Sequence, residues 1–159
     1  MIEFSTAIRA LAGNEVEFVI LGGFAIKAHG SSYITQDLDF AYRRTSENLR
    51  KIVKALAPFK PRPRDFPAEL PFVFDETTLL HGTNFTFATT IGDIDLLGEV
   101  TGIGDYAEVA KEFVIMRLFD YDIKILSLDG LIKSKRAAGR TKDLLVLPEL
   151  EALKELLES

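Results

Sequence analysis

Residues 16–23 read VEFVILGG and are followed by DLDF at residues 37–40, and these two segments set the expected fold. Residues 16–21 are β-branched, aromatic or aliphatic apart from one glutamate, which predicts a buried strand. The pair Gly22-Gly23 ends that strand, and residues 24–29 can begin a helix. Residues 38–42 then predict a second strand. The order is therefore strand, glycine turn, helix and strand.

The residues on either side extend this pattern. Apolar residues at helical spacing predict a helix over residues 2–12, and Thr45 or Ser46 is expected to cap a helix that ends near Leu56. Further on, strands are expected at 72–74, 83–90 and 91–97, a hairpin at 112–126, and helices at 127–138 and 142–157. Since strands and helices do not alternate strictly, we expect an α/β (α+β) fold, with one domain over residues 1–159 and a mixed central β-sheet flanked by helices.

The composition excludes several classes of protein. The chain has 159 residues, of which 47% are hydrophobic and 27% charged, as in one globular domain with a sizeable core. It has no cysteine, which excludes a disulfide scaffold, a thiolate zinc site and a cysteine nucleophile. The net charge of -5 argues against a surface broadly wrapped in nucleic acid, although a local basic groove is compatible with it. Without a long apolar run or a secretory signal, we expect a cytoplasmic protein and no membrane partner.

Two Asp-x-Asp pairs, Asp37/Asp39 and Asp93/Asp95, fall within expected strands. Residues i and i+2 of a strand point to the same face, so each pair projects both carboxylates together. Gathered carboxylates repel one another and resist burial unless they take up protons or bind cations. Hard oxygen ligands of this kind suit Mg²⁺ or Mn²⁺. Zinc fits poorly, because the chain's two histidines share no metal-binding spacing.

The pair Gly22-Gly23 has two interpretations. After a buried strand and before a helix, bare backbone amides can approach a phosphate closely. Alternatively, the two residues form a tight turn that needs no Cβ atoms.

Five of the six prolines lie between Pro58 and Pro71, together with Lys60, Arg62 and Arg64. A segment so rich in proline forms neither a helix nor a central strand. A long loop of this kind is a candidate lid or partner surface, and the alternative is a mobile surface crossing.

A second cluster of cationic residues lies near the end of the chain. Within residues 131–142 there is no acidic residue, and the cations are Lys133, Lys135, Arg136, Arg140 and Lys142. Such a patch could hold phosphates or an RNA backbone. The alternative is a solvated helix end, where the helix dipole favours cations without any ligand. Asp143 is expected to cap the last helix or to pair with Arg140.

Leu21-Gly22-Gly23 followed by Asp37-Leu38-Asp39-Phe40 resembles the signature of the nucleotidyltransferase fold of the DNA polymerase β superfamily. The segment Ile91–Leu97 ends in Asp95-Leu96-Leu97. It resembles the strand that supplies the third acid in small AbiEii-like and minimal nucleotidyltransferases of prokaryotes. Residues 138–144 also resemble a Gly-Arg-x-Lys-Asp-Leu segment of those proteins. Together these motifs span residues 16–145.

The resemblance implies that Asp37, Asp39 and Asp95 are the catalytic residues and hold the metal ions, with Asp95 expected in preference to Asp93. It implies that a nucleoside triphosphate is bound by the residues Gly22, Gly23, Lys133, Arg136, Arg140 and Lys142. The expected function is Mg²⁺- or Mn²⁺-dependent transfer of a nucleoside monophosphate to a hydroxyl of a protein or an RNA such as tRNA, within a toxin–antitoxin or defence pair.

Few residues follow the last motif, whereas family members with a defined acceptor usually carry an added helical domain. The acceptor site is then expected from the Pro-rich loop, from a partner protein or from a second copy of the chain. The alternative from another class is a non-catalytic nucleotide-binding or partner subunit of the same fold. Metal-dependent phosphodiester hydrolysis is a third, because two-metal carboxylate sites also serve nucleases.

Overall fold

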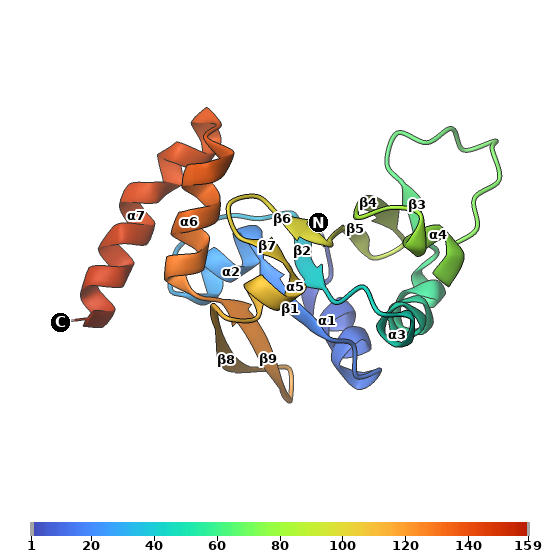
Figure 1. Ribbon diagram of the computed structural model, residues 1–159, viewed down its shortest axis with the longest axis horizontal. Coiled ribbons are helices and arrows are strands. Elements are labelled where there is room, and N and C mark those ends of the chain that lie inside the picture. Colours follow the sequence, from blue (N-terminus) through green and yellow to red (C-terminus); the bar gives the residue numbers. More distant parts are fainter. Residues whose placement is uncertain (1, 159) are drawn as a thin grey trace.

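A mixed sheet with the strand order β3-β4-β5-β2-β1-β9-β8 forms the centre of the molecule (Figure 1), which was obtained as a computed structural model that describes residues 2–158. A separate two-stranded sheet pairs β6 with β7. The strands are β1 (Phe18–Leu21), β2 (Asp37–Tyr42), β3 (Arg62–Pro63), β4 (Asn84–Thr89), β5 (Gly92–Leu97), β6 (Glu99–Val100), β7 (Gly104–Asp105), β8 (Phe113–Leu118) and β9 (Tyr121–Leu126). The helices are α1 (Phe4–Gly13), α2 (Gly22–Ala28), α3 (Ser46–Leu56), α4 (Glu76–Leu80), α5 (Tyr106–Val109), α6 (Leu128–Ala138) and α7 (Thr141–Glu158), with a 3₁₀ turn at Ala57–Phe59.

The middle of the sheet is built from the two strands that the sequence marks most strongly. All four residues of β1 are buried. Strand β1 runs antiparallel to β2, with Leu21 opposite Asp39, and parallel to β9. Strand β2 in turn runs parallel to β5. The expected mixed sheet flanked by helices is therefore confirmed.

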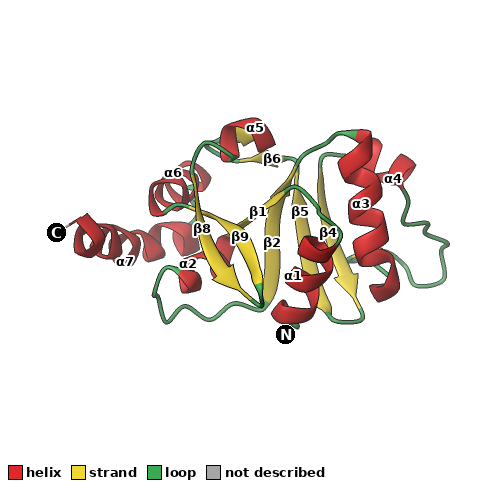
Figure 2. Cartoon of the chain, turned by 90° about the horizontal axis from the view of Figure 1, so that it is seen from below, coloured by secondary structure: helices red, strands yellow, loops and turns green. Residues whose placement is uncertain are grey.

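Helices α1 and α3 pack beside each other and cover one face of the sheet (Figure 2). The Thr45 side chain accepts a hydrogen bond from the Asn48 amide, which confirms the expected cap of α3. Apolar side chains of α1 and α3 recur at helical spacing and are fully buried: Ile8, Leu11, Leu49, Ile52 and Leu56. These two helices leave the opposite face of β2 and β5 free for polar side chains.

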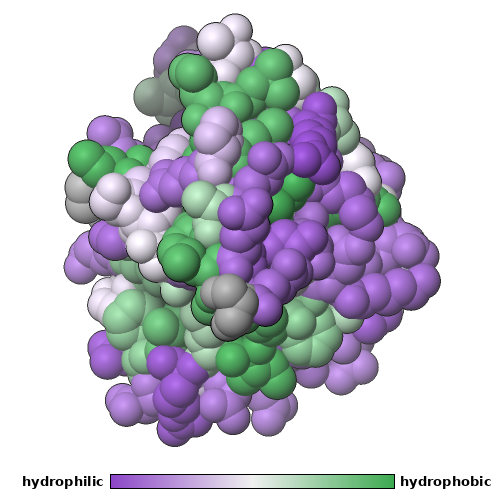
Figure 3. Space-filling model, turned by 90° about the vertical axis from the view of Figure 1, so that its left-hand side faces the viewer, coloured by the Kyte–Doolittle hydropathy of each residue, from purple (hydrophilic) through white to green (hydrophobic). Residues whose placement is uncertain are grey.

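Helices α6 and α7 form a helical hairpin at one end of the molecule, and the loop between β3 and α4 extends at the other end (Figure 1). Ser127 caps α6 as expected, by accepting a hydrogen bond from the Gly130 amide. Figure 3 looks onto the α7 side, where apolar patches lie among charged side chains, and α7 exposes Leu144, Leu145, Leu156 and Leu157. None of the helices within residues 2–158 has the length and apolar character needed to cross a membrane.

Some sequence predictions at the periphery were wrong or incomplete. Residues 72–74 form no strand, because Phe72 and Phe74 pack against Phe87 from irregular backbone. Part of the Pro-rich segment pairs with β4 as the short edge strand β3, where proline is tolerated because one side of the strand has no partner. The short helices α4 and α5 and the β6–β7 pair were not predicted.

Candidate active site

Two Asp-x-Asp pairs lie side by side on neighbouring parallel strands. In the β2–β5 register, Asp37 is opposite Asp93 and Asp39 is opposite Asp95. The residues that alternate with them, Leu38, Phe40, Ile94 and Leu96, are fully buried on the other face. Parallel pairing thus gathers four carboxylates on one face, and the structure brings Asp37, Asp39 and Asp95 together.

Asp39 lies in the most confined position of this cluster. A Cβ atom on Gly22, which has a φ of +62°, would overlap the Asp39 carboxylate. The Oδ1 atom of Asp39 is buried and has no hydrogen-bond partner among the described residues. Burial, with repulsion from Asp95 and Asp37, raises the pKa of Asp39 to about 7. Asp39 therefore presents a buried oxygen without a hydrogen-bond donor.

Arg64, which directly follows β3, inserts its guanidinium among the other carboxylates. Its Nη1 atom lies 3.1 Å from Asp93 Oδ2 and 3.7 Å from Asp37 Oδ2, and its Nη2 atom donates to Asp95 Oδ1. Burial raises the pKa of Asp95, Arg64 opposes that shift, and the charge of Asp37 reinforces it. One arginine thus provides the counter-charge for three of the four aspartates.

The four aspartates offer the type of ligand atom that divalent cations prefer. The cluster offers carboxylate oxygens, which Mg²⁺ and Mn²⁺ prefer, and one of these oxygens is buried without a partner. Within residues 2–158, no three acidic, histidine or cysteine side chains are placed to share one ion. Arg64 stands among the carboxylates, so a cation and this guanidinium would bind the same oxygens.

A hollow of about 270 Å³ opens beside Asp39 and Asp95 and extends toward α6. Its cationic side chains are Lys135 and Arg140. The fully buried Asp143 accepts hydrogen bonds from the Arg140 amide at 3.2 Å and from Arg140 Nε at 2.6 Å. Both interactions expected for Asp143 are therefore confirmed, because it pairs with Arg140 and closes the first turn of α7. Lys135 Nζ lies 3.3 Å from Asp143 Oδ1, so Asp143 holds both cations at the mouth of this hollow.

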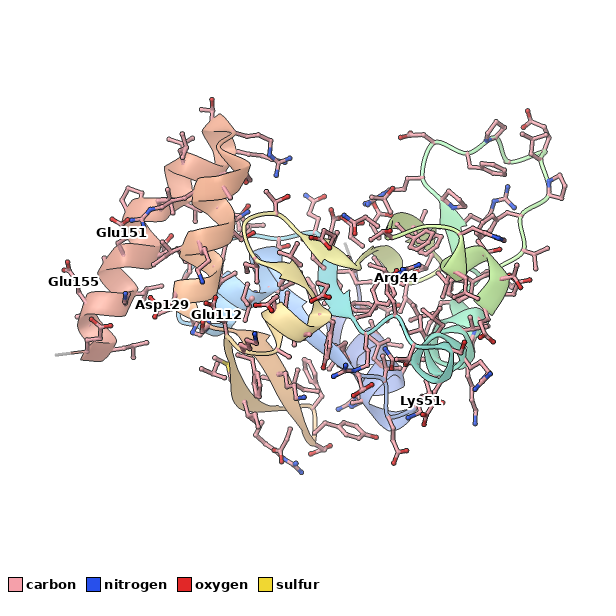
Figure 4. All side chains as sticks on the ribbon, in the orientation of Figure 1. Arg44, Lys51, Glu112, Asp129, Glu151 and Glu155 are labelled. Carbon is pink, nitrogen blue, oxygen red and sulfur yellow. The ribbon has the colours of Figure 1, made fainter. Side chains whose placement is uncertain are left out.

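The remaining expected phosphate-binding cations lie elsewhere. Lys133 and Arg136 line a different hollow of about 1000 Å³ between α6 and α7, where they pair with Glu112 and Glu151. Figure 4 shows these two glutamates with Asp129 and Glu155 on the α6–α7 side of the molecule. Lys142 is exposed near the start of α7 and does not line the hollow beside Asp39.

The two glycines have different surroundings. Gly22 lines the hollow and contacts Asp39, whereas a Cβ atom on Gly23 would meet Thr35 and Tyr33. Gly23 is thus required by the packing of the 33–35 segment. Both histidines end short helices, His29 after α2 and His81 after α4.

Comparisons with known proteins identify this architecture. No protein-family model and no curated protein matches the chain. Among solved structures, it is similar to the lincomycin-bound lincosamide antibiotic adenylyltransferase LnuA, with a TM-score of 0.61 and 14% identity over 95% of this chain and 97% of LnuA. This chain has a nucleotidyltransferase fold.

Two further structures agree with this assignment. A candidate nucleotidyltransferase from Thermotoga maritima gives a TM-score of 0.54 at 15% identity over 99% of this chain and 96% of the other. An antigenic nucleotidyltransferase-like protein from Paracoccidioides brasiliensis gives 0.55 at 14% identity over 98% of this chain and 78% of the other. The expected nucleotidyltransferase fold is therefore confirmed.

Two residues of the site were undervalued by sequence reasoning. Lys135, although part of the basic cluster, was not among the expected nucleotide-binding residues. Helical spacing could have distinguished Lys135 from its neighbours. Lys133 and Arg136, at i and i+3, share one face of α6, whereas Lys135, at i+2, points away from Lys133. Arg64 gave only a weak signal as one of several cations in the Pro-rich segment, because nothing local shows which charge it meets.

Proposed function

We propose that this protein is a nucleotidyltransferase that uses Mg²⁺ or Mn²⁺ and transfers a nucleoside monophosphate from a nucleoside triphosphate to a hydroxyl acceptor. The observation that carries the proposal is the placement of Asp37 and Asp39 beside Asp95, on one face of parallel strands, next to Gly22 and a hollow lined by cations. Asp37, Asp39 and Asp95 are the proposed metal ligands; in the structure, where Arg64 lies among them, no three acidic side chains of residues 2–158 are placed to share one ion. The divalent cations, when bound, offset the negative charge of the phosphates and of the attacking and leaving oxygens.

The proposed reaction is an in-line displacement at the α-phosphorus. A bond forms from the acceptor oxygen to this phosphorus while its bond to the oxygen of the β-phosphate breaks, and pyrophosphate leaves with the bonding electrons. The hydroxyl proton passes to a carboxylate, for which Asp95 is the candidate, since it lines the hollow and its pKa is raised, first of all by burial. Positioning of the two reactants supplies most of the acceleration.

The lysine and arginine side chains that line the hollow have a separate proposed role. Lys135 and Arg140 lie on the hollow side of Asp39 and Asp95, where they can bind the β- and γ-phosphates. The backbone at Gly22 lies directly against Asp39, so phosphate oxygens and the metal ligands meet at one point. We assign weaker roles to Lys133, Arg136 and Lys142, because these residues do not line this hollow.

The proposed acceptor is a compound with a free hydroxyl group. LnuA, which matches over nearly its full length, is a lincosamide antibiotic adenylyltransferase with lincomycin bound. A chain of this size can therefore have a small-molecule acceptor in this fold, alongside the protein or RNA hydroxyl of a toxin–antitoxin or defence system that the sequence suggests. A compound that bears a hydroxyl group is the class that all these acceptors share.

One observation favours a second candidate function. Because Arg64 forms ion pairs with three of the aspartates from within the chain, the same fold could serve as a non-catalytic nucleotide-binding or partner subunit. Such a subunit would bind a nucleoside triphosphate and transfer nothing from it.

Label transfer separates the two candidates. The protein is incubated with α-³²P-labelled ATP, CTP, GTP or UTP, Mg²⁺ or Mn²⁺, and a panel of tRNA, cell extract and hydroxyl-bearing antibiotics. We expect label on an acceptor and release of pyrophosphate with the wild type, and neither with Asp37→Ala/Asp39→Ala. Asp122→Asn, an exposed carboxylate on β9, is the matched control. Nucleotide binding by titration calorimetry without transfer to any acceptor would establish the non-catalytic function instead.

A further inference from the structure

Arg64 is held in place from two directions. Its backbone amide donates to the Thr86 carbonyl on β4 at 2.9 Å, which fixes its Cα beside the edge of the sheet. Its side chain, about one quarter exposed, reaches Asp37, Asp93 and Asp95. The guanidinium therefore lies in a defined position over the carboxylate face and is not a freely solvated surface charge.

The charges in this cluster are unbalanced. Four aspartates face one arginine, with Lys135 as a further cation near Asp39, and Asp39 Oδ1 is buried with no hydrogen-bond partner among the described residues. A guanidinium brings one positive charge, whereas a divalent cation brings two and is coordinated by these same oxygens at shorter range. A divalent cation bound to Asp37 Oδ2 and Asp95 Oδ1 would place its two positive charges beside the guanidinium of Arg64, so each cation opposes binding of the other.

The segment that follows Arg64 is organised around a neighbouring arginine. Arg62 Nη2 donates to the carbonyls of Pro67 at 3.1 Å and Leu70 at 2.8 Å, and its guanidinium lies 5.5 Å from the centre of the Phe66 ring. Asp65 has a φ of +64°, in the left-handed region that L residues rarely adopt. The segment 65–71 is thus a small unit closed by Arg62, and Arg64 is the side chain that ties its start to the carboxylates.

We propose that Arg64 is a built-in competitor of the divalent cations, which sets the metal affinity of the site and whose guanidinium is released when they bind. Without metal, Arg64 binds Asp37, Asp93 and Asp95. When cations bind the aspartates, the guanidinium leaves them and becomes accessible to solvent. The proposal rests on the metal site of the proposed function and deepens it.

Metal affinity is the first test. Mn²⁺ is titrated into the wild type, Arg64→Gln and the control Arg62→Gln, and binding is followed by calorimetry and by the electron paramagnetic resonance signal of free Mn²⁺. Removing a charge-assisted hydrogen bond from a carboxylate corresponds to roughly a tenfold change or more, so we expect Arg64→Gln to bind Mn²⁺ at least about tenfold more tightly than the wild type. Arg62→Gln, which touches no aspartate of the cluster, should bind as the wild type does.

The possible outcomes separate the two proposals. Equal Mn²⁺ affinity of the wild type and Arg64→Gln overturns the competition and leaves the proposed function standing. Absence of Mn²⁺ binding in both proteins overturns the metal site and the competition together. Binding by Arg64→Gln alone, or much tighter binding by it, supports the competition.

Tryptic cleavage is the second test and needs no variant. Lys60 and Arg62 are each followed by proline, which blocks trypsin, and the next Lys or Arg after Arg64 is Lys111. The Arg64–Asp65 bond is therefore the single cleavable tryptic site in the segment.

We expect Mn²⁺ to raise the rate of cleavage at this bond several-fold relative to cleavage after Lys111 in the same digest. In Asp37→Ala/Asp39→Ala, Mn²⁺ should have no effect. Equal relative rates with and without Mn²⁺ in the wild type would contradict release of the Arg64 side chain.

Discussion

Gly22 lies directly against the carboxylate of Asp39, so closely that a Cβ atom at position 22 would overlap the Oδ2 atom of Asp39. The contact joins the end of β1 to the opposing residue of β2, since Leu21 and Asp39 are paired in the register of these strands. It also places bare backbone beside the acid whose pKa is raised most clearly.

Gly22→Ala should therefore impair both the fold and the site. A left-handed φ of +62° costs an L residue about 1–2 kcal/mol, and the overlap with Asp39 adds a displacement of the carboxylate. We expect a lower melting temperature and loss of Mn²⁺ binding, measured by scanning calorimetry and titration. Gly139→Ala is the matched control, because Gly139 has a φ of +66° and a Cβ atom there meets nothing closer than 3.7 Å. If both variants bind Mn²⁺ equally well, the Gly22–Asp39 contact does not shape the site.

The raised pKa of Asp39 predicts an unusual pH dependence of stability. The folded protein holds a proton on Asp39 up to about pH 7, whereas an unfolded chain releases it near pH 4. Because the native state binds more protons in this window, the free energy of unfolding in EDTA should fall as the pH rises from about 4 to about 7. Asp39→Asn should reduce this decline, since the raised pKa of Asp95 contributes the rest, and it should be the more stable protein at pH 8. The measurement is urea unfolding across the pH range, with Asp122→Asn as the exposed control. Parallel profiles for the wild type and Asp39→Asn would show that Asp39 ionises normally.

Asp143 should be a structural support for the cationic side of the hollow. It is fully buried and accepts from Arg140 and Lys135. Hydrogen bonds from Arg140 lower the pKa of Asp143 despite its burial, so the stability it contributes is present above the unfolded pKa and is lost as the pH falls. Asp143→Asn should lower the free energy of unfolding by about 2 kcal/mol at pH 7. Glu149→Gln, on an exposed position of the same helix, should change it little. If both variants lower the free energy of unfolding by a similar amount, the effect comes from removing a negative charge from α7 and not from breaking the ion pairs of Asp143.

Lys135 and Lys133 provide a direct test of which face of α6 binds phosphate. Lys135 lines the hollow with Asp39, whereas Lys133 lines the larger hollow and pairs with Glu112. We expect Lys135→Gln to weaken nucleoside triphosphate binding by roughly tenfold or more, as for the loss of a charge-assisted phosphate contact. Lys133→Gln should leave it unchanged. Calorimetric titration with a non-hydrolysable ATP analogue measures both, and the reverse ranking would move the triphosphate to the α6–α7 hollow.

Much of the fold could be predicted from short-range patterns. Alternation of acids with Leu38, Phe40, Ile94 and Leu96 indicated which face of each strand is buried, and the caps at Thr45 and Ser127 placed two helices. These features depend on neighbours within a few residues, so the local sequence carries them. The segment 72–74 was misjudged because its aromatic residues read as a strand, while their packing on Phe87 fixes an irregular path.

Local patterns were sufficient to predict the strands that carry the two acid pairs, the break at Gly22-Gly23 where β1 gives way to α2, and the class of the sheet. Three relationships depend on how the whole chain packs: Asp39 faces Asp95, Arg64 lies among the aspartates, and Lys135 rather than Lys133 lines their hollow. Strand pairing and charge contacts between distant segments arise when the whole chain packs, and no local periodicity encodes the register or the partner of a side chain.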